Sequence, residues 1–491
     1  MTAAPPDTWA VVLAAGEGKR MRSGRAKVLH LLAGRPLVEY PLALAREVGA
    51  RGIVVVVGHQ ADLVRAALGG ADDVRFADQP EQRGTGHAVA MAKGAVPGTA
   101  TEILLLYADV PLLGAATVAR LLARHRQTRA AATVLTFRPA DPTGYGRIVR
   151  RDARVRAIVE ERDARAAERR IRECNSGVYV FDPRRLWPAL DRLAPDNDQG
   201  EYYLTDVVGL LARQGRRVEP VPVGDPLEVA GVNDRGQLAA LEQVVRRRIL
   251  ERLMRDGVTV RDPASTYVDA TVTVGRDTVL HPGVALAGRT AIGEGCEVGA
   301  GCQLTDATVG DGVTLRPYCV VDGSTIEARA TLGPFARLRT GTVVEAGADI
   351  GNFIEIKNAR IGPRVKAHHV AYLGDATVGA GANIGAGTIT VNYDGVTKHR
   401  TTIGARAFVG SNASLVAPVT IGDDAYVGAG SVITRDVPPE SLALERAPQV
   451  LKEGWSRRRR ARLAGGAAAA PEGSPEGSEA GAPAPPGPSS A

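Results

Sequence analysis

A spacing of six residues organises the second half of the chain, from about Val274 to Ile433. Aliphatic side chains recur at every sixth position in three runs, and glycine follows many of them. An α-helix would repeat every 3.6 residues and a simple strand every two, so neither explains this period. Period six fits a triangular coil whose aliphatic residues point inward and whose tight corners favour small residues. The aliphatic positions are Val274, Leu280, Leu286, Ile292, Val298 and Leu304, then Ile326, Leu332, Leu338, Val344, Ile350 and Ile356, then Ile403, Val409, Leu415, Ile421, Val427 and Ile433.

The repeat bounds the shape of this half. Stacked coils rise by the ordinary strand spacing of about 4.8 Å, so the span predicts roughly nine coils and a rod on the order of 40 Å long. The spacing alone leaves the hand of the coil open. Aromatic residues make up only 4% of the chain, and a narrow interior filled by Val, Ile, Leu and Ala tolerates that scarcity.

Two breaks in the phase of the repeat indicate where a site can be built. The step from Ile361 to Val378 is 17 residues, one short of three sides, and the step from Ile384 to Ile403 is 19, one over. Irregular segments on a rigid scaffold are where binding and catalytic residues concentrate. We therefore expect functional residues in the polar and aromatic segments that fill these gaps, Lys366–Tyr372 and Val391–Gly395.

The first half, residues 9–230, alternates short apolar runs with helical stretches. This alternation predicts an α/β fold with a mostly parallel sheet and helices on both faces. The expected helices include Leu37–Val48 and Thr117–Arg126. The expected strands are Trp9–Ala14, Ile53–Gly58, Ile103–Tyr107, Ala131–Phe137 and Gly177–Phe181.

A single long helix, Asp234–Asp256, is predicted between the two halves. Asp234 can cap it, Gln237 stands at the capping-box position, and Gly257 ends it. Its apolar stripe consists of Leu238, Leu241, Val245, Ile249 and Leu253.

Length and pattern set the domain boundaries. The 491 residues exceed one ordinary domain. We place the α/β domain at residues 1–235, the connecting helix at 236–256, the rod at 257–455, and a basic and then low-complexity tail at 456–491. After about Leu463 the tail is Ala, Gly, Pro, Ser and Glu, which cannot bury a core, so we expect it to be disordered.

Charge and cysteine content exclude several classes. The net charge of +7 suits phosphorylated substrates, whereas the short run Arg457–Arg462 is typical of a solvated tail, so nucleic acid is not expected. The four cysteines lack CxxC spacing, so neither zinc nor a disulfide framework is expected. The apolar run Ala10–Ala15 is too short to span a bilayer, and residues 1–8 lack a signal peptide. We therefore expect a soluble cytoplasmic protein with no membrane partner.

A glycine-rich segment, Leu13–Met21, follows the first expected strand. Its glycines would let backbone N–H groups approach phosphate oxygens, and Arg20 and Lys27 add positive charge. It is not a Rossmann GxGxxG motif, because Met21 replaces the third glycine, nor a Walker A loop, because no Ser or Thr follows Lys19. Taken alone, a phosphate loop and an ordinary strand-to-helix turn are equally good interpretations.

Further motifs follow in order along the chain: Lys27–Leu29, Gln79, Gly84–Ala88, Tyr107–Pro111, Gly144–Ile148, Glu160, Asn175–Gly177 and Gly231–Asn233. In combination they resemble the sugar-1-phosphate nucleotidyltransferases. Together with the rod and Lys366–Tyr372, residues 9–455 resemble the bacterial family of bifunctional N-acetylglucosamine-1-phosphate uridyltransferases and glucosamine-1-phosphate acetyltransferases. The resemblance implies a Rossmann-like nucleotidyltransferase domain followed by a left-handed parallel β-helix.

The resemblance also implies the chemistry. Such an enzyme transfers acetyl from acetyl-CoA to glucosamine-1-phosphate, then uridylyl from UTP to N-acetylglucosamine-1-phosphate, and releases pyrophosphate. The product, UDP-N-acetylglucosamine, is a precursor of peptidoglycan and lipid A. Mg²⁺ as cofactor and a homotrimer are implied as well. Charge neutralisation and in-line positioning would carry the uridylyl transfer.

Roles follow by resemblance for the N-terminal site. Arg20 and Lys27 would neutralise phosphates as catalytic residues, and Asp109 and Asn233 would hold Mg²⁺. Gly146, Glu160 and Asn175 would bind the amino sugar. The other residues expected at the UDP-sugar are Leu13, Ala14, Ala15, Gly16, Gln79, Gly84, Thr85, Tyr107 and Ala108.

The rod's site is implied in the same way. His369 would be the general base, since imidazole has a suitable proton affinity, and Arg339 and Lys357 would anchor the sugar phosphate. The sugar would be oriented by Tyr372, Asn383, Asn392 and Tyr393, and acetyl-CoA would be contacted by Ala386, Asn392, Tyr393, Ser411, Ala429 and Arg446.

Four positions depart from the family's pattern. Ala26 and Thr340 stand where proline is usual, and Ala108 and His368 stand where glycine is usual. Ala108 puts only the fine fit beside the metal in doubt. His368 is a neighbour that competes with His369 for the role of base.

Two other functions remain to be weighed. A single-activity nucleotidyltransferase with a regulatory rod, like glucose-1-phosphate adenylyltransferases, would not need Arg339, Lys357 and His369. A non-catalytic assembly subunit, like those of translation-factor exchange complexes, would not need Asp109 and Asn233. The presence of both sets favours the bifunctional enzyme.

Overall fold

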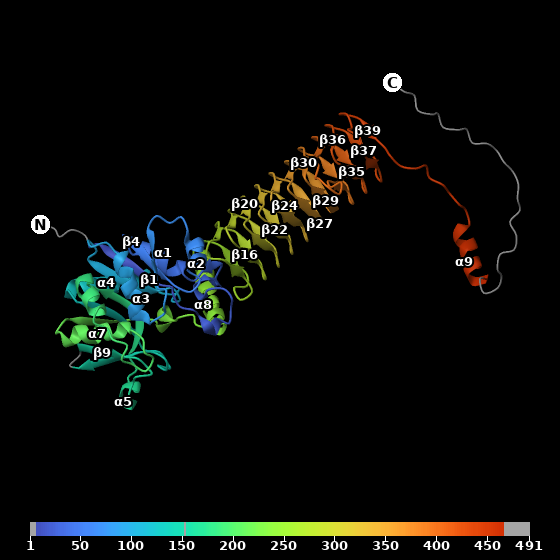
Figure 1. Cartoon of the computed structure of the whole chain (residues 1–491). Coiled ribbons are helices and arrows are strands. Elements are labelled where there is room, and N and C mark those ends of the chain that lie inside the picture. Colours follow the sequence, from blue (N-terminus) through green and yellow to red (C-terminus); the bar gives the residue numbers. More distant parts are fainter. Residues whose placement is uncertain (1–5, 152–153, 466–491) are drawn as a thin grey trace, which may run out of the picture. The chain divides into compact units, whose positions relative to one another are not determined.

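The computed structural model describes residues 6–151 and 154–465 (Figure 1). Contacts divide the chain into two units, residues 1–444 and 445–491, which are described separately. The first unit holds an α/β domain, a connecting helix and a rod of stacked coils.

The α/β domain is built on a sheet of strand order β11-β7-β10-β6-β1-β4-β5, with the pair β8–β9 attached at β10. Only β10 runs antiparallel to its neighbours along that path, so the mostly parallel sheet is confirmed. Each of the five expected strands lies within a few residues of its predicted bounds. The strands are β1 (Thr8–Leu13), β4 (Gly52–Val57), β5 (Val74–Asp78), β6 (Glu102–Tyr107), β7 (Ala132–Phe137), β8 (Arg147–Arg151), β9 (Arg154–Val159), β10 (Cys174–Phe181) and β11 (Val218–Pro222), besides the short pair β2 (Leu31–Leu32) and β3 (Arg35–Pro36).

Helices pack on this sheet and bury two apolar clusters, one on each of its faces. The two expected helices are present as α1 and α4. The helices are α1 (Glu39–Glu47), α2 (Ala61–Leu68), α3 (Thr85–Met91), α4 (Ala115–Thr128), α5 (Ala166–Arg169), α6 (Pro183–Leu190) and α7 (Leu204–Arg213).

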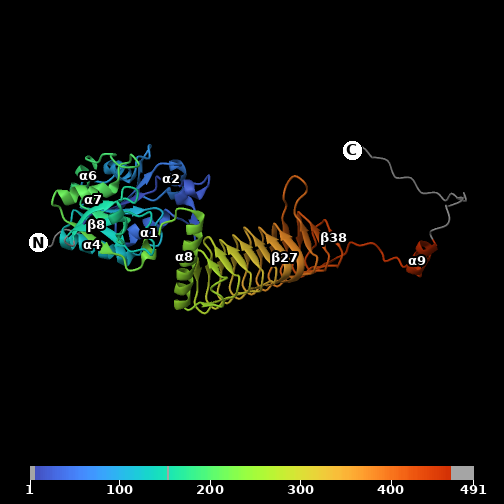
Figure 2. The same ribbon diagram turned by 90° about the horizontal axis from the view of Figure 1, so that it is seen from below.

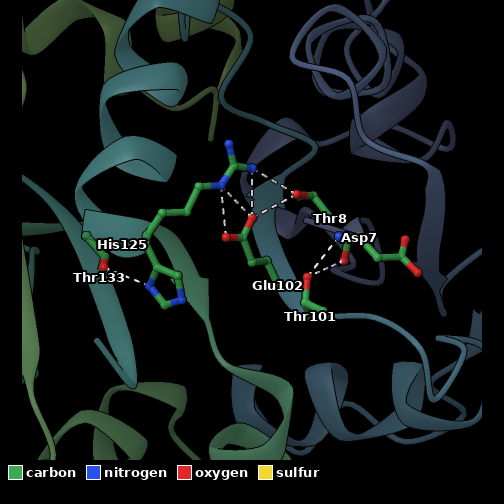
Figure 3. Close-up of polar contacts among 7 residues, drawn as sticks. Asp7, Thr8, Thr101, Glu102, His125 and Thr133 are labelled. Carbon is green, nitrogen blue, oxygen red and sulfur yellow. Dashed lines mark hydrogen bonds and ion pairs between the residues drawn. The ribbon is translucent and has the colours of Figure 1, made fainter. Parts of the chain in front are cut away.

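An ion pair with a buried carboxylate ties helix α4 to the amino-terminal edge of the sheet (Figure 3). Glu102, at the start of β6, receives hydrogen bonds from Arg126 of α4 at 2.8 and 2.9 Å and from the Thr8 hydroxyl at 2.8 Å. One carboxylate is thus matched by one guanidinium. Beside it, burial lowers the pKa of His125, whose Nδ1 lies 2.9 Å from the Thr133 hydroxyl.

The connecting helix is α8 (Arg235–Arg255). Asp234 caps it as expected, accepting from the Gln237 amide at 2.8 Å. The Gln237 side chain reaches the Asn233 amide rather than that of Asp234, so the reciprocal half of the box is displaced by one residue. The predicted stripe is buried against both the α/β domain and the first coils of the rod, except for half-buried Leu238.

The rod is a parallel β-helix of the left-handed, hexapeptide-repeat type. All of the expected aliphatic positions are buried except Val274, which is partly exposed in the first coil. One face has nine strands, in keeping with the coil number expected: β14 (Thr273–Val274), β17 (Ala291–Ile292), β20 (Thr308–Val309), β23 (Thr325–Ile326), β26 (Val343–Val344), β28 (Arg360–Ile361), β30 (Ala376–Val378), β33 (Thr401–Ile403) and β36 (Val419–Ile421).

The other two faces form a continuous sheet that begins and ends beyond the recognisable repeat. Strands β27 (Asp349–Lys357) and β29 (Lys366–Gly374), nine residues each, pass through a corner without interruption. The remaining strands are β12 (Thr259–Val260), β13 (Tyr267–Val268), β15 (Val279–Leu280), β16 (Ala285–Ala287), β18 (Glu297–Val298), β19 (Gln303–Thr305), β21 (Thr314–Leu315), β22 (Val320–Asp322), β24 (Thr331–Leu332), β25 (Arg337–Arg339), β31 (Asn383–Ile384), β32 (Ile389–Val391), β34 (Phe408–Val409), β35 (Ser414–Val416), β37 (Tyr426–Val427), β38 (Val432–Ile433) and β39 (Leu442–Ala443).

In the structure, the short break in the repeat is one of several such steps, whereas the long break contains a loop. Partners 17 positions apart occur at four steps along the nine-stranded face, for example Ala291 with Thr308 and Arg360 with Thr377. A short step is therefore an ordinary coil with a tighter corner, and it does not by itself mark a site. The long step does contain an excursion, the loop between β32 and β33, which Figure 2 shows in orange leaving the rod.

In the second unit, residues Trp455–Gly465 form helix α9, which includes the basic start of the predicted tail. Arginine, alanine and leucine, which fill this segment, are strong helix formers. The rest of that tail, residues 466–491, lies outside the described residues. In the described chain no helix is long and apolar enough to cross a membrane.

A side chain at Gly351 should destabilise the rod, because its Cβ would lie 1.8 Å from the carbonyl oxygen of His368 on the next coil. We expect Gly351→Ala to cost about 1–3 kcal/mol, the usual penalty of overpacking, in urea denaturation followed by circular dichroism. Gly98→Ala is the control, since nothing lies within 4 Å of its added Cβ. An unchanged unfolding midpoint for Gly351→Ala would contradict this packing.

Candidate active sites

A cavity of about 270 Å³ opens where β1, β5 and β6 end. Most of the residues expected at the nucleotide line it: Leu13, Ala14, Ala15, Gly16, Lys27, Gln79, Gly84, Thr85, Tyr107 and Asp109. Ala108 is buried just behind it. The sequence reasoning missed Gln82, which donates to the Ala15 carbonyl at 2.8 Å, and Glu201. No sequence signal distinguished these two from ordinary surface residues.

The glycine-rich loop brings Lys27 to the cavity. Gly18 has a φ of +65°, which favours glycine. A Cβ there would lie 2.6 Å from the Cβ of Lys27, so the loop and Lys27 approach closely only because Gly18 has no side chain. Gln79 is nearly fully buried, and its amide nitrogen donates to the Gly84 carbonyl at 3.1 Å, which fixes the amide in the cavity wall.

Next to this cavity lies a second one of about 280 Å³, lined by Glu17, Gly18, Lys19, Arg20, Lys27 and Asn233. The Lys27 ammonium lies 2.5 Å from Asp109 Oδ2 and 3.4 Å from Asn233 Oδ1. Arg20 donates to the same Asn233 oxygen at 2.9 Å. Asp109 and Asn233, more than 120 positions apart in the sequence, thus both direct an oxygen atom at the Lys27 ammonium.

The oxygen pair suits a magnesium ion. Carboxylate and amide oxygens are the ligands this ion prefers, and it retains water and phosphate oxygens beside one or two protein ligands. The residues described include no cluster of three or more His, Cys, Asp or Glu side chains that could hold a metal alone. Asp109 and Asn233 therefore fit a metal that substrate phosphates help to bind.

The three residues expected at the amino sugar lie together, outside the lining of the first cavity. A Cβ on Gly146 would be 3.3 Å from Glu160 Oε2 and 3.6 Å from Asn175 Cβ. Burial, and then nearby acidic groups, raise the pKa of Glu160, although a hydrogen bond of 3.0 Å from the Thr205 hydroxyl opposes this. Burial raises the pKa of Tyr107, which lines the cavity and feels the charge of Glu160.

On the rod, the long strands β27 and β29 pair in parallel and set Asn352 beside His369. The two side chains meet at 3.2 Å, from His369 Nδ1 to Asn352 Oδ1. This contact leaves Nε2 of the exposed His369 directed away from Asn352. The neighbouring His368 instead places its Nε2 3.0 Å from the Asp349 carboxylate. The geometry distinguishes two adjacent histidines that the sequence could separate only by alignment.

Arg339 and Lys357 are direct partners on neighbouring coils. Arg339 is paired with Glu355 at 2.9 Å. Lys357 lies beside Lys398, a residue that the sequence reasoning did not single out although it belongs to the over-long segment. The neighbouring Lys398 ammonium, and then burial and Arg339, lower the pKa of Lys357. Three cations therefore converge on the expected sugar-phosphate position.

A buried carboxylate lies under this cationic cluster. Asp375 receives hydrogen bonds from the side-chain amides of Asn358 at 2.6 Å and Asn392 at 2.5 Å. Burial would raise the pKa of Asp375, but these bonds and the charges of Lys398 and Lys357 outweigh it and hold the pKa below its usual value. Asp375 thus orients Asn392, the first residue of the loop.

The loop itself is internally braced. Tyr393 and Lys398 form a bridge across it, and the His399 amide donates to the Asn392 carbonyl at 2.9 Å. Asp394 accepts from the amides of Val396 at 2.8 Å and Thr397 at 2.7 Å. Lys398 is therefore held at the base of the loop, while Tyr393 is more than half exposed.

The other residues expected in the rod's site lie at separate places. Tyr372 sets its hydroxyl over Gly374 and pairs with Ile389 on one face of the rod, whereas Asn383 pairs with Lys366 on the neighbouring face. Ala386, Ser411 and Ala429 stand at equivalent corners of successive coils, where the Asn412 amide donates to the Ala386 carbonyl at 2.7 Å and the Gly430 amide to the Ser411 carbonyl at 2.8 Å. Arg446 lies in the second unit.

Known proteins share this organisation. The family model described as a MobA-like NTP transferase domain matches residues 10–256, the GMPPB C-terminal domain matches 263–370, and the bacterial transferase hexapeptide (six repeats) matches 400–435. The bifunctional protein GlmU of Anaeromyxobacter sp. (strain Fw109-5) is 52% identical over 490 residues, 98% of this chain and 99% of that protein. Those of Geotalea uraniireducens and Brevibacillus brevis are 49% identical over 447 residues and 50% over 444, covering 91% and 90% of this chain and 98% and 96% of the relatives.

Proposed function

This chain belongs to the family of the bifunctional protein GlmU, and we propose how its residues carry out the two transfers. It is a bifunctional transferase that makes UDP-N-acetylglucosamine, a cell-wall precursor. Acetyl passes from acetyl-CoA to glucosamine-1-phosphate, and uridylyl then passes from UTP to N-acetylglucosamine-1-phosphate with release of pyrophosphate. The observation that carries the assignment of sites is the pairing of Lys27 with Asp109 and Asn233 on one domain and of His369 with Asn352 on the other.

In the uridylyl transfer, the first cavity holds the uracil and ribose, and the adjoining cationic cavity holds the phosphates. Lys27 and Arg20 offset negative charge as the sugar phosphate attacks the α-phosphorus of UTP, which makes positioning and charge the main sources of rate. Asp109 and Asn233 would hold Mg²⁺, which would supply positive charge to offset that of the substrate phosphates. Gly146, Glu160 and Asn175 receive the amino sugar.

In the acetyl transfer, Arg339, Lys357 and Lys398 anchor the sugar phosphate. The nitrogen of the sugar's 2-amino group forms a bond to the acetyl carbon while His369 Nε2 takes a proton from that amino group. The bond from the acetyl carbon to sulfur breaks, and CoA leaves as its thiolate. Asn352 orients the imidazole for this purpose, because its side-chain oxygen accepts a hydrogen bond from the Nδ1–H of His369. Ala386, Ser411 and Ala429 receive the CoA, while Tyr372, Asn383, Asn392 and Tyr393 orient the sugar.

We further place the enzyme in the cytoplasm as a homotrimer. A triangular rod has flat faces that can pack around a threefold axis, and closed cyclic symmetry is usual for homo-oligomers. The loop between β32 and β33 would then lie against a neighbouring subunit.

Asp109→Ala should abolish UDP-sugar formation, because the metal loses its only proposed carboxylate and Lys27 loses its partner at 2.5 Å. The acetyl transfer, followed as CoA release from acetyl-CoA and glucosamine-1-phosphate, should persist in the same preparation and shows that the chain is folded. Wild-type uridylyl transfer by this variant at ordinary Mg²⁺ would contradict the assignment of Asp109 and Asn233 as metal ligands.

His369→Ala should lower acetyl transfer about 10²–10⁴-fold, the usual contribution of a positioned base. Uridylyl transfer should not change. The matched control is His368→Ala, which removes an equally exposed neighbour bound to Asp349 and should cost far less. If His368→Ala were the inactive variant, the assignment of the base would be off by one. If both variants kept full acetyl transfer, the rod would be a scaffold beside a single-activity nucleotidyltransferase.

Lys398→Ala should raise the KM for glucosamine-1-phosphate about 10–100-fold, the range expected for losing a hydrogen bond between charged groups. The kcat should change much less, because Lys398 does not reach the reacting amine. Arg400→Ala is the control, since it removes an exposed cation of the same loop whose side chain has one hydrogen bond among the described residues, to Thr377 at 3.5 Å. Equal KM values for both variants and the wild type would remove Lys398 from the phosphate anchor.

A further inference from the structure

A third cavity in the α/β domain belongs to neither proposed site. Its volume is about 460 Å³, larger than that of the nucleotide cavity. Helix α4, strand β9 and the turn between α7 and β11 form its walls. The charged residues that line it are Arg124, Arg154, Arg156, Arg216, Arg217 and Glu219.

The cavity lies at the opposite edge of the sheet from the nucleotide. Strand β11 runs parallel to β7, which is parallel in turn to β6 and β1, and the cavity includes Val218 at the amino-terminal start of β11. The glycine-rich loop instead follows the carboxyl end of β1. A ligand in this cavity would therefore not compete directly for the residues that hold UTP.

Positive charge in the cavity greatly exceeds negative charge. Glu219 is the only carboxylate among the described residues that line it. Both of its oxygens are used, because Arg124 donates to Oε2 at 2.6 and 2.9 Å and Arg217 donates to Oε1 at 2.6 Å. Burial would raise the pKa of Glu219, but these guanidinium groups outweigh it and lower the pKa. Glu219 thus holds two arginines in the wall and is itself fully paired.

The remaining three arginines point to an anionic ligand. The side chains of Arg154, Arg156 and Arg216 make no hydrogen bond or ion pair within the described residues. Arg154 and Arg156 are exposed on either side of buried Val155, so the alternation of β9 puts both on one face of the strand. Like charges held together in a concave wall repel one another unless an anion joins them.

The shape and lining select the kind of anion. Guanidinium groups bind phosphate through paired, parallel hydrogen bonds. The volume is that of a small-molecule site, whereas nucleic acid is usually bound along an extended basic stripe. The walls expose mainly charged side chains and offer no aromatic ring for a base. We propose that this arginine cavity is a second, non-catalytic site that binds a small multivalent phosphate anion without a nucleobase.

Equilibrium dialysis of inorganic tripolyphosphate with the full chain at about 0.15 M salt, where exposed charges are screened, tests this proposal. The nucleotide site and the rod's cationic cluster can also bind the probe, so the number bound per chain is the informative quantity. Arg154→Glu combined with Arg156→Glu should bind one tripolyphosphate fewer per chain than the wild type. The milder Arg216→Ala should weaken that same site at least tenfold.

The matched control combines Arg185→Glu with Arg192→Glu, which changes the net charge equally at two exposed positions of the same domain outside the cavity. This control should keep the wild-type stoichiometry, and both double variants should keep wild-type uridylyl transfer, which shows that they fold. Equal losses in the two double variants would mean that net charge alone governs binding. Wild-type stoichiometry in the cavity variants, or tighter binding of a single-stranded oligonucleotide than of tripolyphosphate, would overturn the proposal.

Discussion

The aliphatic residues that stack inside the rod fix the register between successive coils, and the rod's site depends on that register. Each buried Val, Leu or Ile contributes roughly 1.5–3 kcal/mol by leaving water. A slip of one residue would turn an entire strand inside out, so the stacked positions tolerate a single alignment. Ile350 therefore lies beside Ala367, and two residues further along Asn352 meets His369. A contact between a proposed base and the residue that orients it is thus a consequence of core packing several ångströms away.

The α/β domain solves a different problem, which is to bring distant charges to one point. Lys27 follows the first loop, Asp109 follows β6 and Asn233 precedes α8. The ends of parallel strands at one edge of the sheet gather them, and Gly18 allows the final approach. The Lys27 ammonium balances the Asp109 carboxylate. Substrate charge can replace this internal pairing, which makes the cluster suited to binding an anion and a cation together.

Much of this could be predicted from the sequence, because periodic burial leaves a periodic pattern. The period of six predicted the rod and its inward residues, and alternating runs predicted β1, β4, β6, β7 and β10. The short step does not by itself distinguish a site, because Arg360 and Thr377 are 17 apart in the same way as Ala291 and Thr308. Period alone cannot separate a tight corner from a functional irregularity.

The residues missed by the sequence reasoning share one property, namely that their importance comes from another coil or another loop. Asn352 matters because of a histidine on the next coil, and Asp375 because it holds Asn392 beneath Lys398. Neither has a local signal, since an isolated Asn or Asp beside a strand is an ordinary turn residue. The same property explains why the rod can carry a precise site with few irregularities. Once successive coils are locked in register, a side chain on one coil and a short loop on another are sufficient to build it, and the long strands β27 and β29 extend that rigid register through the corner where His369 lies.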